Sequence, residues 1–161
     1  MQHPATAPRG QNVEPSPPRP TSSLELAALP NAVPLARCHT NAFLRSWLLP
    51  PEVIETAELL VSELATNALP RNQAHHGSTR TYPELADVQR CWLRLRLTDQ
   101  ALVIEMRDTD PRPPVRQWAT DDAESGRGLL LIEALSHQWG YYYEGPYKIV
   151  WCEVACVLTI R

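Results

Sequence analysis

The sequence predicts an α+β fold, a two-layer α/β sandwich in which one mixed, mainly antiparallel sheet carries its helices on one face. Three observations predict this class. Apolar residues recur at helical spacing before residue 70, and they alternate with polar residues at strand spacing after residue 90. The polar side of the first alternating segment carries Trp92, Arg94 and Arg96, which indicates a sheet with one solvated face. A length of 161 residues favours one domain.

The N-terminal segment is rich in proline. Half of the 16 prolines lie in the first 34 residues, and little apolar periodicity precedes Leu24. We therefore expect residues 1–22 to form a disordered arm and residues 23–161 to form the folded domain. The arm lacks the continuous apolar segment of a secretory signal, and no apolar run is long enough to span a membrane. These features predict a cytoplasmic protein.

The first half of the folded part predicts one strand and two helices. Residues 23–28 form a short possible edge strand, and a helix follows over about 34–48, with a proline in its first turn. A second helix is expected from Pro51 to about Leu69, because an apolar stripe at 3.6-residue spacing runs along it and Pro70 ends it. The polar residues 70–87 predict no regular element.

The second half predicts two hairpins around one helix. Residues 91–97 and 101–108 are expected to be strands joined by the turn 98–100. A loop rich in proline and aspartate follows over 109–125, and residues 128–135 predict a short apolar helix. A final hairpin is expected over 138–144 and 147–157, around the Gly145-Pro146 turn.

Charge and cysteine content exclude some function classes. The net charge is −3 and the basic residues are scattered, so no nucleic-acid-binding footprint is indicated. Lys148 is the only lysine beside 14 arginines, which we attribute to the codon chemistry of a GC-rich genome. The cysteines Cys38, Cys91, Cys152 and Cys156 form no CxxC pair. We interpret them as small buried hydrophobes in a reducing cytoplasm rather than as disulfides or metal ligands.

Three features carry possible chemistry. Glu63 and Asn67 lie four residues apart in the second helix, so one face offers a carboxylate and an amide oxygen suited to magnesium, although such pairs also occur on solvated faces. Asp108 ends a strand, where it could accept a hydrogen bond from an exocyclic amine or simply initiate a turn. Gly126 and Gly128 precede an apolar helix, as in phosphate-binding loops and also in ordinary loop-to-helix junctions.

Taken together, these features resemble the histidine-kinase-like ATPase superfamily, which has the Bergerat ATP-binding fold. Glu63-Leu-Ala-Thr-Asn67 resembles its N box, Asp108 the aspartate of its first glycine box, and Gly126-Arg127-Gly128-Leu129 its second. Within the superfamily the chain looks closest to bacterial anti-sigma factor serine/threonine kinases. The segments 61–68 and 126–134 carry that likeness, with Trp139-Gly140 and Lys148-Ile-Val-Trp151.

The resemblance implies an ATP site that uses Mg²⁺. Glu63 would be the general base, Asn67 would ligate magnesium, and Asp108 would bind the adenine amino group. Backbone amides near Gly126 and Gly128 would hold the phosphates, and Arg127 could add a phosphate contact or remain solvated. The expected partners are a sigma factor, an anti-anti-sigma protein, or both. Neither nucleic acid nor a membrane is expected to bind directly, and homodimerisation stays open.

Two departures from the family pattern qualify this expectation. The first glycine box usually reads Asp-x-Gly-x-Gly, whereas this chain has Asp108-Thr-Asp110-Pro-Arg112, and the side chain of Asp110 could crowd the nucleotide. Ile149 stands where relatives often carry a threonine that helps to bind adenine. The alternative hypotheses are therefore a partner-binding module with weak or no ATP binding, and an accessory ATPase-like subunit of a signalling cluster.

Overall fold

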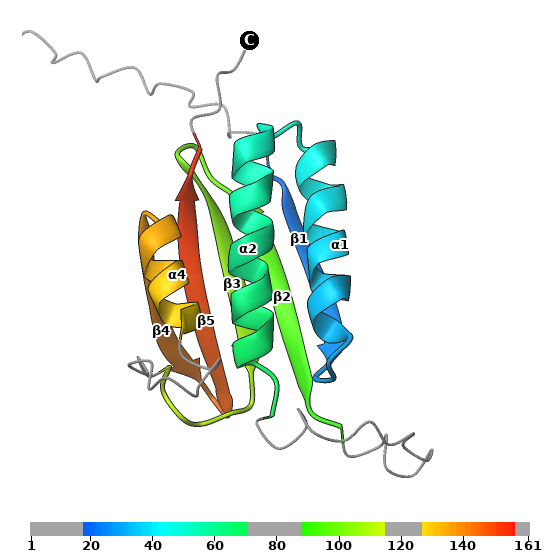
Figure 1. The fold of residues 1–161 in the computed structure, drawn as a ribbon, viewed down its shortest axis with the longest axis vertical. Helices are drawn as coiled ribbons and strands as arrows, with labels where there is room; N and C mark the ends of the chain where they lie inside the picture. The colour runs from blue at the N-terminus through cyan, green and yellow to red at the C-terminus, as the bar shows by residue number, and fades with distance from the viewer. Residues whose placement is uncertain (1–17, 71–87, 115–126, 157–161) are drawn as a thin grey trace, which may run out of the picture.

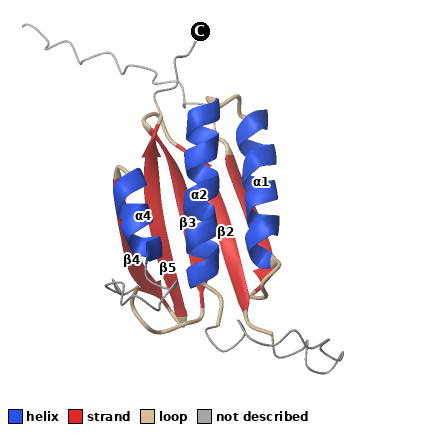
Figure 2. Ribbon diagram, in the orientation of Figure 1, coloured by secondary structure: helices blue, strands red, loops and turns tan. Residues whose placement is uncertain are grey.

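The computed structural model describes residues 18–70, 88–114 and 127–156. In this part of the chain, three helices lie on one face of a five-stranded sheet (Figures 1 and 2), which confirms the predicted two-layer α+β fold. The elements in chain order are β1 (Thr21–Ala27), α1 (Ala32–Ser46), α2 (Pro51–Asn67), β2 (Arg90–Leu97), β3 (Ala101–Asp108), α4 (Arg127–Leu135), β4 (Gln138–Glu144) and β5 (Tyr147–Ala155).

The sheet has the strand order β1-β2-β3-β5-β4, and each of these four pairings is antiparallel. The described sheet is thus antiparallel throughout rather than mixed. The reason is that β5 folds back from β4 through a tight turn at Gly145, whose φ is +58°, and then pairs with β3. β5 thereby separates β4 from β3, the strand that β4 would have met in parallel.

Several predicted boundaries differ from the observed ones by one or two residues, and the starts of β1 and α1 are two examples. β1 begins at Thr21, where Thr21 pairs with Arg96 and Ser22 with Leu95, so these two residues belong to the sheet and not to the expected arm. The start of this edge strand was not predicted because its first residues are polar and break the apolar alternation. α1 begins at Ala32, two residues before the predicted start, and Pro34 still falls within its first turn.

The core lies between the helices and one face of the sheet. α2 faces it with Ala57, Leu60, Val61, Leu64 and Ala65, all at most 2% exposed. Leucines of β2 and the inward residues of β3 and β5 complete it.

The other sheet face is more polar. There the guanidinium of Arg107 lies 3.6 Å from the ring centroid of Tyr147 and 5.4 Å from that of Trp92. Arg94 is exposed on this face, as the strand pattern predicted.

The cysteines are all unpaired, and three of the four are buried. Burial raises the pKa of the Cys152 thiol to about 12 and that of Cys91 to about 11, so both stay neutral thiols in the core. Cys38 is exposed, contrary to the expectation for all four cysteines, because it lies on the outer face of α1. Within the described residues, no helix combines the length and the apolar character that crossing a membrane requires.

Leu60→Ala should lower the free energy of unfolding by about 2–5 kcal/mol, because it leaves a cavity where α2 meets the sheet. Leu59→Ala is the matched control: Leu59 is 51% exposed, and its loss should change stability by no more than about 0.5 kcal/mol. Urea denaturation of both variants measures the difference. Equal losses would contradict the assigned burial of α2.

Candidate functional site

Glu63 and Asn67 lie in the last two turns of α2, one turn apart as predicted. Glu63 is half-buried and Asn67 is exposed. The buried stripe of α2 fixes this orientation, because Leu60 and Leu64 face the core from the other side of the helix. In Figure 1, the end of α2 lies at the same end of the sandwich as the start of α4 and the loop that follows β3.

Gly128 brings α4 into contact with the Glu63–Asn67 pair. A Cβ atom added at Gly128 would lie 2.5 Å from Oε2 of Glu63 and 3.5 Å from Nδ2 of Asn67. The first distance is shorter than real Cβ contacts allow, so a side chain at this position would displace the Glu63 carboxylate. The structure therefore brings three of the six predicted site residues together, and a side chain at position 128 would have to share this space with the movable end of Glu63.

Asp108 ends β3 at the same end of the sandwich and is only 4% exposed. Its Oδ1 accepts the backbone N–H of Asp110 at 2.8 Å and lies 3.3 Å from Nζ of Lys148. Burial raises the pKa of Asp108, while the nearby Lys148 ammonium acts in the opposite direction. Asp108 is thus a buried carboxyl group that pairs with Lys148 and also initiates the turn into the loop, as one of the two expectations had it.

Lys148 is a site residue that the sequence analysis did not identify. It pairs directly opposite Asp108 in the β3–β5 ladder, is 5% exposed, and donates a hydrogen bond to the carbonyl of Arg112 at 3.1 Å. The available signal was its position in β5. Lys148 lies on the same inward face of β5 as Val150 and Cys152, where an unpaired charge would cost free energy.

Ile149 is the residue that stands where relatives often carry an adenine-binding threonine. It lies on the opposite face of β5 from Lys148. Neighbouring residues of a strand point to opposite faces, so Ile149 faces away from Asp108 and Lys148. Its partners in the ladders are Arg107 and Tyr142. The residue that shares the face of Asp108 is Lys148, and the comparison with the family threonine at Ile149 does not describe this site.

The loop after β3 is held in place by several contacts. Arg112 donates to both carboxylate oxygens of Asp110, from Nε to Oδ1 at 2.9 Å and from Nη2 to Oδ2 at 2.7 Å. This pairing lowers the pKa of Asp110 to about 2. The hydroxyl of Tyr143 also donates to the carbonyl of Pro111 at 3.0 Å. The charge of the Asp110 carboxylate is therefore paired with that of Arg112.

Other predicted features cannot be placed. Gly126 lies outside the described residues. Arg127 is the first residue of α4, and its side chain is not among those described.

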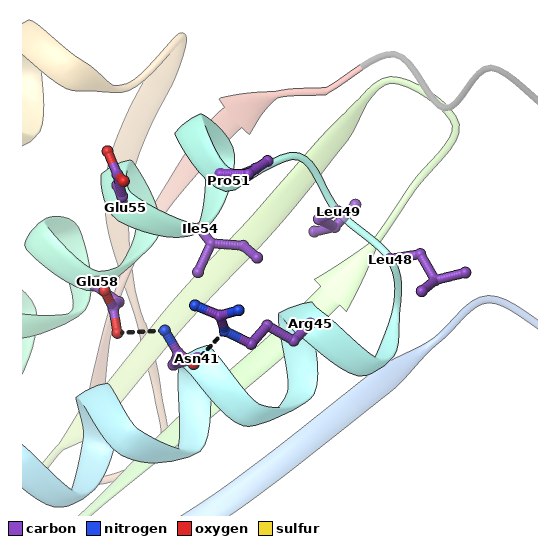
Figure 3. Close-up of a pocket in the computed structure, with 8 residues that line it drawn as sticks. All are labelled: Asn41, Arg45, Leu48, Leu49, Pro51, Ile54, Glu55 and Glu58. Atoms are coloured by element: carbon purple, nitrogen blue, oxygen red, sulfur yellow. Dashed lines mark hydrogen bonds between the residues drawn. The ribbon is translucent and has the colours of Figure 1, made fainter.

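A hollow of about 490 Å³ lies elsewhere, between the C-terminal half of α1 and the first turns of α2. Figure 3 shows Asn41 of α1, which donates to Glu58 and accepts from Arg45, and Leu48 in the segment that joins α1 to α2. None of the predicted site residues lines this hollow. It is thus separate from the Glu63–Asn67 face of α2.

Comparison with known proteins identifies the family. The model of the histidine kinase-like ATPase domain matches residues 26–152, and the chain belongs to this family. This confirms the resemblance drawn from the N box and glycine boxes. No curated protein sequence matches the chain.

One solved structure with a similar fold is that of the RsbU and RsbW domains of Rv1364c from Mycobacterium tuberculosis. The two chains share 16% identity with a TM-score of 0.55, over 84% of this chain and 32% of the other. The present chain thus spans about a third of that protein, and the likeness concerns the fold.

Gly128→Ala should change nucleotide affinity while leaving the free energy of unfolding nearly unchanged. Alanine favours helix over glycine by about 1 kcal/mol, so the free energy of unfolding should change by no more than about that amount. The added methyl group should displace the Glu63 carboxylate and weaken Mg-ATP binding by about tenfold. Thermal denaturation and calorimetric titration measure the two effects. Unchanged nucleotide affinity would show that the Gly128–Glu63 contact is not part of a nucleotide site.

Proposed function

We propose that the protein is an ATP-dependent regulator of bacterial transcription that resembles the anti-sigma factor serine/threonine kinases. It would phosphorylate or sequester a partner in the cytoplasm, the partner being a sigma factor or an anti-anti-sigma protein. The observation that carries this proposal is the contact of Glu63, Asn67 and Gly128 at the junction of α2 and α4. Membership of the histidine kinase-like ATPase family supports the nucleotide.

The donor groups at this junction fit Mg-ATP. Magnesium keeps several waters and takes few protein ligands when phosphates supply the rest, so the single amide oxygen of Asn67 suffices. The space that Gly128 leaves lets the start of α4, where backbone N–H groups are free, approach this pair. Bound magnesium would neutralise charge on the transferred phosphoryl group.

In this scheme Glu63 accepts the proton of a serine or threonine hydroxyl of the partner. The hydroxyl oxygen forms a bond to the γ-phosphorus. The bond between the γ-phosphorus and the β,γ-bridging oxygen breaks, and ADP leaves. Asp108 orients the nucleotide by accepting a hydrogen bond from the adenine amino group. Amides near Gly126 and at the start of α4 hold the phosphates, with Arg127 as a candidate further contact.

A second candidate function is a partner-binding module without phosphoryl transfer. The loop after β3 favours it, because that loop lacks both family glycines and is fastened by Lys148, Tyr143 and the Asp110–Arg112 pair. A loop fixed in this way has less freedom to close over a nucleotide. Calorimetry with Mg-ATP separates the two functions: binding supports the ATP-dependent regulator, and no heat at millimolar nucleotide supports the binding module.

Glu63→Gln should reduce phosphoryl transfer to the cognate substrate by at least about 100-fold, because it removes the proton acceptor and keeps the shape. ATP affinity should stay nearly unchanged. Glu55→Gln, on an exposed turn of the same helix, is the matched control and should transfer phosphate normally. Radiolabelled ATP with a partner captured from the native cell provides the assay. Normal transfer by Glu63→Gln would show that Glu63 is not the base.

Asn67→Ala should weaken ATP binding by on the order of tenfold in the presence of magnesium and much less in the presence of EDTA. The reason is that Asn67 contributes through the metal ion rather than through the nucleotide itself. Calorimetric titration under the two conditions measures the difference. An equal loss under both conditions would contradict the assignment of Asn67 as a magnesium ligand.

A further inference from the structure

Lys148 is an unusual residue for this chain. It is the only lysine beside 14 arginines, and its side chain is almost fully buried. A buried ammonium group is stable only when its donors are satisfied and its charge is balanced. Within the candidate nucleotide site, the Asp108 carboxylate balances the charge of Lys148, and the Arg112 carbonyl accepts one of its hydrogen bonds.

In the described part of the chain, the polar contacts of the Asp108 carboxylate are made by only one of its oxygens. Both the backbone N–H of Asp110 and the ammonium of Lys148 approach the same oxygen, Oδ1. Among the described residues, no hydrogen bond to Oδ2 is found, whereas Oδ1 has two partners. This part of the chain thus leaves Oδ2 as the oxygen that a ligand could approach.

The charge of Lys148 also decides what Asp108 can do. An ionised carboxylate only accepts hydrogen bonds, whereas a protonated one also donates. Burial raises the pKa of Asp108, and among the described residues Lys148 is the cation that opposes this shift. The backbone N–H of Asp110 also favours the ionised carboxylate, whereas the Asp110 side-chain charge disfavours it, and the neutral thiol of Cys91 from β2 supplies no balancing charge.

We propose that Lys148 is the specificity-determining partner of Asp108: it holds Asp108 as an ionised acceptor through Oδ1, so that the site selects a 6-amino purine nucleotide over a 6-oxo purine nucleotide. This inference rests on the proposed function and concerns a residue to which the N box and the two glycine boxes assign no role. The 6-amino group donates a hydrogen bond to an ionised Asp108, whereas a 6-oxo group needs a donor. By fastening the Arg112 carbonyl, Lys148 also ties the loop to β5.

The first test needs no nucleotide. Because Lys148 is the only lysine, protein labelled with ¹³C-lysine gives one side-chain Cε signal by NMR. Asp108→Asn should shift this signal clearly, because it removes the facing charge. Asp99→Asn, at an exposed carboxylate, is the control and should leave it unchanged. An unshifted signal in Asp108→Asn would overturn the pairing of Lys148 with Asp108.

The second test compares ATP with ITP, which carries a 6-oxo group, by calorimetry. The wild-type protein should prefer ATP by at least about tenfold. Lys148→Met should bring the two affinities close together, and Lys148→Arg should restore part of the preference. Arg94→Ala, which removes an exposed cation on the other face of the sheet, is the control for loss of a positive charge, and it should keep the preference for ATP.

The outcomes separate the two proposals. Lack of binding of either nucleotide by the wild-type protein would overturn the proposed ATP-dependent function, whatever the lysine signal shows. Binding with an unchanged preference for ATP in Lys148→Met would overturn the role of Lys148 alone. A wild-type preference for ITP would also overturn the proposed role of Lys148, because the ammonium group would then donate a hydrogen bond to the 6-oxo group.

Discussion

The burial of the apolar stripe of α2 is the constraint on which the candidate site depends. Leu60, Val61 and Leu64 are at most 2% exposed, and they fix the rotation of the helix on the sheet. Because side chains of a helix point in directions set by their spacing, this burial turns Glu63 and Asn67 away from the core. α2 also lies between α1 and α4 and packs against both (Figure 1), so its C-terminal turns meet the first turn of α4. The same packing that stabilises the fold thus assembles the polar junction.

The second half of the site depends on the sheet. The β3–β5 ladder places Lys148 opposite Asp108, and a shift by one residue would move Lys148 to the other face. The loop after β3 then takes its course from local polar contacts, the Asp110–Arg112 pair above all. Where the family uses glycines to free this loop, the present chain holds it with side chains. This difference is the physical reason to weigh a partner-binding module beside a kinase.

The sequence predicted the elements that carry periodic patterns and the residues that act within one element. α2 was placed within two residues because prolines flank its apolar stripe, and the Glu63–Asn67 pair followed from helical spacing alone. Contacts between elements could not be predicted in this way. The approach of Gly128 to Glu63 requires the packing of α4 on α2, and the Lys148–Asp108 pair requires the register of β3 with β5. The polar start of β1 and the exposure of Cys38 were missed because neither leaves an apolar pattern.

The central claim is that the junction of α2, α4 and the loop after β3 binds nucleotide, and not the hollow between α1 and α2 shown in Figure 3. The most direct test is an NMR titration of ¹⁵N-labelled protein with a Mg-bound, non-hydrolysable ATP analogue. Our account predicts that the amide signals that move belong to residues around Asn67, Asp108–Arg112 and Gly128. Signal changes confined to residues around Arg45, Leu48 and Glu55, or no changes at millimolar analogue, would contradict it.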